Sequence, residues 1–227
     1  MSRWLEEVSS AHTVVIRALR QMIEAPSPAV FYFLASKIPG CLDSTDALEV
    51  LNMRIAIISD IHDNIWSLER VLVRLADCEM LLCLGDFCAP FTLSAVAAGF
   101  HRPVHVVWGN NDGDKLLLTR VADKAGNVSL YGFFAQLHVD DRVLALNHYP
   151  EIALPLAASG QFDLVCHGHN HQRKAELQGR TWLVNPGEVM GRFGTVSYAV
   201  YDTASNQAQI YELLSGLSIW ARIIRRC

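Results

Sequence analysis

The sequence lacks three patterns that mark common protein classes. Its six cysteines include no C-x-x-C pair, and no run approaches the roughly 18 apolar residues that span a bilayer. Basic residues are not in excess, because 19 Lys and Arg stand against 23 Asp and Glu, for a net charge of −4. The scattered cysteines favour reduced thiols, and the other two absences argue against a membrane-spanning protein and a chain drawn to nucleic acid by its overall charge.

Two catalytic motifs and one targeting signal are also missing. The absence of G-x-S-x-G and of G-x-x-x-x-G-K-[ST] argues against a nucleophilic-serine hydrolase and a P-loop kinase. Glu6 and Glu7 come early, and no basic-then-apolar secretory signal precedes them. We therefore expect a cytoplasmic protein with reduced thiols. A zinc or disulfide role for Cys83 and Cys88, which flank Asp86, is the alternative.

The chain divides near Met53 into two parts of unequal clarity. Residues 3–25 carry apolar side chains at roughly helical spacing, and Pro26 and Pro28 then interrupt the pattern. We predict that residues 1–52 form a helical extension of unknown role and that residues 53–227 form the functional domain. The extension is an ordered appendage, an oligomer contact or an upstream read-through before a start at Met53, and the sequence does not rank these alternatives.

From Met53 onward, β-rich apolar runs alternate with amphipathic stretches, and a β-rich half follows. Helices are expected over 65–77, 91–98, 115–125 and 152–158, and the first should turn Trp66, Leu68, Val71, Leu72 and Leu75 inward. Strands are expected over 54–59, 80–84, 105–108, 137–139, 143–146, 163–166, 175–177, 181–184, 195–201 and 209–213. This order predicts a layered α/β fold whose sheets are covered by helices.

Polar side chains follow five of the expected strands at the point where each strand ends. They are Asp60 and His62, then Asp86, Asn110, His148, and finally His169 and His171. In open α/β sheets the carboxyl ends of the strands are where ligands bind. Each short motif alone is an ordinary turn or loop, but their joint placement predicts that these side chains meet at one site.

The donor set points to divalent transition metals. Two carboxylates, one amide oxygen and four imidazoles suit Mn²⁺, Fe²⁺, Co²⁺, Ni²⁺ or Zn²⁺ better than Ca²⁺ or Mg²⁺, which prefer oxygen ligands. Seven ligands are too many for one tetrahedral ion but fit two ions that share a carboxylate. Two ions about 3.5–4 Å apart can clamp the attacking and leaving oxygens of an in-line displacement. Their excess positive charge would attract a phosphate anion.

These motifs, in this order, resemble those of the calcineurin-like metallophosphoesterases, over Met53 to about Leu213. Gly109-Asn-Asn-Asp-Gly113 and Asn185-Pro-Gly-Glu188 are similar to the small bacterial and archaeal phosphodiesterases of the YfcE type. The resemblance implies a four-layer α/β/β/α sandwich that hydrolyses a phosphate ester by in-line attack of a hydroxide bridging two divalent ions, with Mn²⁺ the first candidate. It assigns one ion to Asp60, His62, Asp86 and His171, and the other to Asp86, Asn110, His148 and His169.

One departure from the family pattern bears on the chemistry. Many members carry a histidine where this chain has Asn111, and that imidazole helps to protonate the leaving group. Asparagine cannot titrate, so a general-acid contribution of about 10²–10⁴-fold is absent or comes from elsewhere. Diesters and acidic leaving groups are therefore the expected substrates. Beside the proposed ligands Asp86, Asn110 and His148, we count Asn111 among the catalytic residues.

Two further residues are candidates for contact with the substrate phosphate. Asn64 and Arg192 follow the first and last motifs, and the alternatives are a helix cap for Asn64 and a solvated loop charge for Arg192. His148 precedes Tyr149-Pro150 where the family more commonly has glycine, which leaves the shape beside that metal open. The expected partner is a small phosphate ester, without a membrane or a clear nucleic-acid surface, and homo-oligomer formation stays open. The rival functions are a scaffold with an impaired site and a nuclease.

Overall fold

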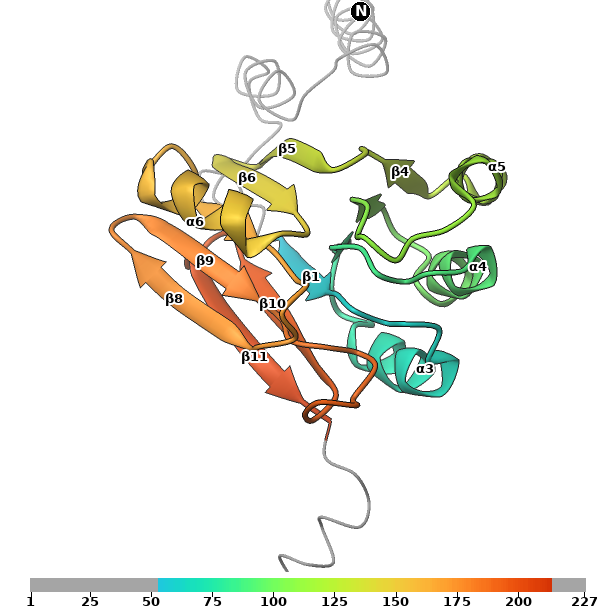
Figure 1. Cartoon of the computed structure of the whole chain (residues 1–227). Helices are drawn as coiled ribbons and strands as arrows, with labels where there is room; N and C mark the ends of the chain where they lie inside the picture. The colour runs from blue at the N-terminus through green and yellow to red at the C-terminus, as the bar shows by residue number, and fades with distance from the viewer. Residues whose placement is uncertain (1–52, 214–227) are drawn as a thin grey trace, which may run out of the picture. The chain divides into compact units, whose positions relative to one another are not determined.

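A computed structural model of the chain describes residues 53–213, and its elements are arranged as shown in Figure 1. The helix predictions within residues 1–52 lie outside the described residues. Among residues 53–213, no helix combines the length and apolarity that crossing a membrane requires.

The first sheet has six strands in the order β11-β10-β1-β2-β3-β4. Strands β1 to β4 pair in parallel, and β10 and β11 add antiparallel strands beside β1. Helices α3, α4 and α5 connect the successive parallel strands. In chain order the elements are β1 (Arg54–Ile58), α3 (Ile65–Arg74), β2 (Met80–Cys83), α4 (Pro90–Gly99), β3 (Val104–Val106), α5 (Lys115–Ala125), β4 (Val128–Leu130), β10 (Ser197–Asp202) and β11 (Gln207–Glu212).

The second sheet has five strands in the order β5-β6-β7-β9-β8. Its first two strands form the predicted hairpin, with the turn at Asp140 and Asp141. Strand β7 is parallel to both of its neighbours, and α6 connects it to β6. The elements are β5 (Phe134–Val139), β6 (Arg142–Asn147), α6 (Pro150–Ala158), β7 (Leu164–Cys166), β8 (Lys174–Gln178) and β9 (Thr181–Asn185).

Three apolar clusters separate four layers. Strand β1 shows how the first two are built, because Ala56 and Ile58 pack among the buried residues of α3 and α4 while Ile55 and Ile57 pack against the second sheet. Successive side chains of a strand point to opposite faces, so the apolar run Ile55–Ile58 of this central strand contributes to both clusters. The third cluster lies between the second sheet and α6. The predicted α/β/β/α sandwich is confirmed.

Two details of the structure differ from the expectation. Trp66 is 79% exposed, so the prediction that it faces the core is wrong. The buried side of α3 is formed by Ser67, Leu68, Val71 and Leu72, and Trp66 lies away from this stripe. Strand β4 was not predicted at all. It has three residues, none of them fully buried, and its pairing with β3 is what makes it a strand.

Candidate metal centre

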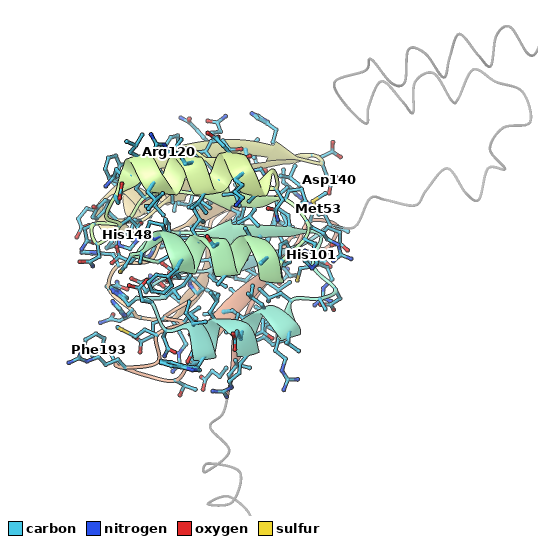
Figure 2. All side chains as sticks on the ribbon, turned by 90° about the vertical axis from the view of Figure 1, so that its right-hand side faces the viewer. Met53, His101, Arg120, Asp140, His148 and Phe193 are labelled. Carbon is cyan, nitrogen blue, oxygen red and sulfur yellow. The ribbon has the colours of Figure 1, made fainter. Side chains whose placement is uncertain are left out.

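The seven predicted ligands meet at one edge of the two sheets. They follow β1, β2, β3, β6 and β7, whose carboxyl ends lie together, so residues far apart in sequence become neighbours. In Figure 2, His148 lies at this edge and Met53, which precedes β1, lies at the opposite one. Two groups of three residues each bring their ligand atoms within 4.8 Å of one another. One group is Asp60, His62 and His171, and the other is Asp60, Asp86 and His148.

Most of these ligands have an unusual backbone conformation. Five have positive φ, a region that residues other than glycine rarely adopt: Asp60 (55°), His62 (45°), Asp86 (53°), His169 (72°) and His171 (59°). Such conformations cost about 1–3 kcal/mol each and persist only where the surrounding structure imposes them. Their concentration at one edge of the fold marks a functional site.

Glycine at two loop positions allows the carboxylates to approach the backbone. A side chain at Gly109 would overlap Asp86 Oδ1, and one at Gly168 would overlap Asp60 Oδ2 and Ser59 Oγ. These glycines begin the Gly-Asn and Gly-His motifs of the sequence. Because glycine has no Cβ atom, the loops that follow β3 and β7 can pack directly against Asp86 and Asp60.

The first ligand set contains buried polar atoms without hydrogen-bond partners among the described residues. These include Asp60 Oδ1 and His62 Nε2, which lie 3.8 Å apart. His171 Nε2 lies 3.5 Å from the same carboxylate oxygen. An unpaired buried polar group costs about 1–3 kcal/mol. A cation between these atoms would satisfy all three, so the residues of this set fit a metal ion.

Hydrogen bonds on the far side of two imidazoles orient their Nε2 atoms toward the site. His171 Nδ1 lies 2.7 Å from Glu188 Oε2, and His148 Nδ1 lies 2.7 Å from the Leu84 carbonyl oxygen. The carbonyl can only accept, and the carboxylate does the same, so each Nδ1 carries the proton. Each Nε2 of the neutral ring then offers a lone pair, as a metal ligand must.

The second ligand set surrounds Asp86. The Oδ2 atom of Asp86 lies 3.4 Å from His148 Nε2 and 3.5 Å from His62 Nε2. It is therefore close to one imidazole from each of the two predicted ligand sets. Asn110 Oδ1 lies 3.2 Å from His148 Nε2 and 2.8 Å from His169 Nδ1. This arrangement of an amide oxygen, two imidazoles and a carboxylate fits a second cation.

Without a metal, the charges of this site favour protonated imidazoles. The nearby Asp60 carboxylate raises the pKa of His62 against the opposing effect of burial. Burial lowers the pKa of His148, but its contact with Asp86 outweighs this and the pKa is raised. Burial would raise the pKa of Asp86, yet hydrogen bonds from His148 and Asn111 hold it below its usual range. Protons therefore compete with cations for the same lone pairs.

Asp112 and Glu188 organise the site, although no role was predicted for either. The Asp112 carboxylate accepts hydrogen bonds from the backbone N–H groups of Asp86 (3.0 Å), Cys88 (2.8 Å) and Gly109 (2.7 Å), and so joins the β2 and β3 loops. Glu188 is 1% exposed and contacts His171. It follows β9 closely, so the strand-end pattern that found the ligands also contained the signal for Glu188.

The three remaining predicted residues lie around the ligands. Asn111 donates from its backbone N–H to Asp86 Oδ1 and from its side chain to Asp86 Oδ2, both at 2.8 Å. Asn64 caps α3 by accepting from the Ser67 N–H and donates to the Met190 carbonyl oxygen. The Arg192 guanidinium lies 5.6 Å from the centroid of the Phe193 ring, on an exposed loop. Substrate contact by Asn64 and Arg192 stays a prediction.

The pattern of the calcineurin-like phosphoesterase superfamily domain matches residues 53–206. The chain belongs to the calcineurin-like phosphoesterase superfamily. It is a hydrolase of phosphoric ester bonds, and the family uses divalent metals, which the two ligand sets fit. The predicted family is confirmed, while the individual roles of the site residues stay predictions.

Both a curated relative of this calcineurin-like phosphoesterase and a solved structure similar to it are named as phosphodiesterases. The phosphodiesterase MJ0936 of Methanocaldococcus jannaschii is 26% identical over 160 residues, which are 68% of this chain and 96% of the relative. The solved structure of an archaeal phosphodiesterase has a TM-score of 0.66 at 24% identity and covers 71% of this chain and 100% of its own.

Two further solved structures share the fold. The phosphoesterase YfcE of E. coli has a TM-score of 0.52 at 21% identity and covers 71% of this chain and all of its own. Vacuolar protein sorting 29 of Cryptosporidium parvum has a TM-score of 0.56 at 15% identity, with coverage of 73% and 93%. The fold therefore occurs in proteins with names from different functional classes, so the site itself must carry the functional argument.

Proposed function

We propose that this chain is a phosphodiesterase that uses two divalent metal ions, with Mn²⁺ as the first candidate. The observation that carries the proposal is the position of Asp86 Oδ2 between His62 Nε2 and His148 Nε2, which belong to different ligand sets. Asp60 is close to both sets as well, so two carboxylates offset the charge of the cations. Asp60, His62, Asp86 and His171 would hold one ion, and Asp86, Asn110, His148 and His169 the other.

The metals and the protein have separate tasks in this proposal. When bound, two such ions supply a nucleophilic hydroxide at neutral pH and stabilise the attacking and leaving oxygens. Leu84 and Glu188 orient His148 and His171, and Asn111 holds Asp86 through two hydrogen bonds. Asp60, Asp86 and His148 are buried while Asn110 and Asn111 are exposed, so a small phosphate ester would enter from the side of the β3 loop.

The choice of a diester follows from the absence of a titratable group at Asn111. The amide donates to Asp86 and has no proton to give to a departing alkoxide. A diester with an acidic leaving group needs no such proton. The relative MJ0936 is named a phosphodiesterase, which supports this choice. The division of the chain at Met53 stays part of the proposal, because every proposed ligand lies at or after Asp60.

Substrate preference tests this function. Protein reconstituted with Mn²⁺ should hold two ions per chain and hydrolyse bis-p-nitrophenyl phosphate in preference to unactivated alkyl monoesters. Asn111→His should raise turnover of alkyl monoesters relative to the activated diester by about 10²-fold, the lower end of a general-acid contribution. Elemental analysis and steady-state rates measure both. Saturation at one ion, or a wild type that prefers alkyl monoesters, would contradict the proposal.

Metal affinity should fall as pH falls, starting above pH 6.5. His62 and His148 bind metal only as neutral rings, and both have pKa values raised above the ordinary 6.5. Below their raised pKa values each imidazole is protonated, so every ion must displace protons and binding weakens. Calorimetric titration with Mn²⁺ in buffers of different ionisation enthalpy, between pH 6 and 8, measures the protons released. A metal affinity that does not change between pH 6 and 8 would contradict the assignment of His62 and His148 as metal ligands.

A further inference from the structure

Phe193 is a large apolar side chain that stands exposed beside the metal centre. It is 71% exposed, and its ring meets that of His171 edge to face, with centroids 5.2 Å apart and an interplanar angle of 89°. Figure 2 shows Phe193 projecting from the molecule on the same side as His148. Other exposed aromatics, such as Phe91, show no ring contact with a proposed ligand in the part of the chain that the structure describes.

The backbone beneath Phe193 is fixed to the metal ligands. The N–H groups of Phe193 and Gly194 both donate to Glu188 Oε1, at 2.6 and 2.7 Å. The other oxygen of this buried carboxylate contacts His171 Nδ1. The Met190 N–H also donates to the Asp60 carbonyl oxygen, at 2.9 Å. The ring is thus placed in advance relative to the reacting centre, which reduces the entropy cost of binding.

The charge next to the ring suits a phosphate ester. The Arg192 guanidinium lies 5.6 Å from the centroid of the Phe193 ring, and both side chains are exposed. A cation and a flat apolar face therefore stand together beside the proposed ligand His171. A ligand that combines a phosphate anion with an aromatic group would match both, because aromatic rings stack on one another and on guanidinium planes.

A second aromatic side chain contacts the other ligand set. The Tyr149 ring lies 5.2 Å, between centroids, from the rings of both His148 and His169. Phe193 contacts His171, which belongs to the first set. Each predicted metal position therefore has one aromatic neighbour. A phosphodiester has two ester arms that leave the phosphorus in different directions, so the two aromatic surfaces correspond to the two arms.

We propose that Phe193 is a specificity-determining residue and that the preferred substrate carries a flat aromatic group, aryl or nucleobase, on an ester arm that stacks on it. This inference rests on the proposed phosphodiesterase function and names its substrate class. Tyr149 supports the opposite arm. Stacking of a base on an aromatic side chain is worth about 1–3 kcal/mol, which corresponds to a preference of about 5- to 150-fold over an aliphatic group.

The test compares two non-hydrolysable ligands on the metal-loaded full chain. Wild-type protein should bind phenylphosphonate at least about fivefold more tightly than ethylphosphonate in calorimetric titrations. Phe193→Ala should reduce this ratio to near one with unchanged metal content, and Phe193→Leu should keep only part of it. Phe91→Ala removes an aromatic that is 57% exposed and should leave the ratio at the wild-type value. Because neither ligand is hydrolysed, the comparison does not depend on turnover.

Rates on two diesters with the same leaving group identify the aromatic source. The p-nitrophenyl esters of thymidine 5′-phosphate and of methyl phosphate differ only in the retained arm. If Phe193→Ala lowers kcat/KM for the thymidine ester only, the group that stacks on Phe193 is the nucleobase. If kcat/KM falls equally for both esters, the stacking group is the p-nitrophenyl ring that they share. A Phe193→Ala protein that keeps the phenyl preference overturns the inference even if diesters are hydrolysed. A chain that shows the preference but hydrolyses no diester would overturn the proposed function alone.

Discussion

Replacing Asp86 by asparagine is expected to weaken the binding of both metal ions and to reduce turnover by about 10³-fold. The Asp86 Oδ2 atom lies within 3.5 Å of imidazole nitrogens from both ligand sets. The substitution removes a negative charge from between two cations and replaces one oxygen by an NH₂ group, which has no lone pair for a metal. Asparagine tolerates the φ of 53° at this position, so the fold should survive.

Two further variants separate the loss of a shared ligand from the loss of a single-ion ligand and from a general effect of an Asp-to-Asn change. His62→Ala removes a ligand from one set only and should deplete one ion. Asp140→Asn makes the same chemical change at another positive-φ position, 51° in the β5–β6 turn, away from the site (Figure 2). Metal stoichiometry, rates and circular dichroism should be measured on the same preparations. A folded Asp86→Asn protein with two ions and normal turnover would remove Asp86 from the shared position.

The ligand positions could be predicted because strand ends carry a local signal. A short apolar run followed by Gly-Asp or Gly-His is visible in the sequence, and parallel strands bring their carboxyl ends to the same edge. The order of the motifs then indicated the family and the four layers. The hairpin at Asp140 and Asp141 was equally local, because two alternating runs flank a two-residue turn.

Features that depend on tertiary contacts could not be predicted in the same way. The apolar character of Trp66 suggested burial, but the face that α3 turns to the sheet is decided by Leu68, Val71 and Leu72. The role of Glu188 depends on its contact with His171, and that of Asp112 on three N–H groups from two loops. For Asn64 the sequence left a helix cap and contact with the substrate open, and in the structure its amide caps α3.

Replacing Glu188 by glutamine is expected to lower the affinity of the first metal position by about 10–100-fold. The Phe193 and Gly194 N–H groups can only donate, so they fix the amide oxygen of glutamine where Oε1 now lies. The NH₂ group must then face His171 Nδ1. Nδ1 can accept that hydrogen bond only after its proton has moved to Nε2, and a protonated Nε2 cannot bind a metal.

The opposite orientation of the glutamine amide is unfavourable. It would place NH₂ against two backbone N–H groups at a position that is 1% exposed, and leaving buried donors unpaired costs about 1–3 kcal/mol each. The metal-free variant should therefore melt close to the wild-type temperature, because glutamine keeps the hydrogen bonds and only the tautomer of His171 changes. If Glu188 served stability alone, the variant would melt at a lower temperature and keep its metal affinity.

Metal titration and nitrogen-15 NMR of His171 distinguish these two outcomes. The NMR spectrum should report the proton on Nδ1 in wild-type protein and on Nε2 in Glu188→Gln, while His148, held by the Leu84 carbonyl, keeps its tautomer. Glu212→Gln serves as the matched control, because it removes a carboxylate that pairs with Arg173 at exposed positions. Its metal affinity should equal that of the wild type. If Glu188→Gln binds both ions with wild-type affinity, Glu188 does not orient His171 for metal binding, and its hydrogen bonds serve only to hold the loop that carries Phe193.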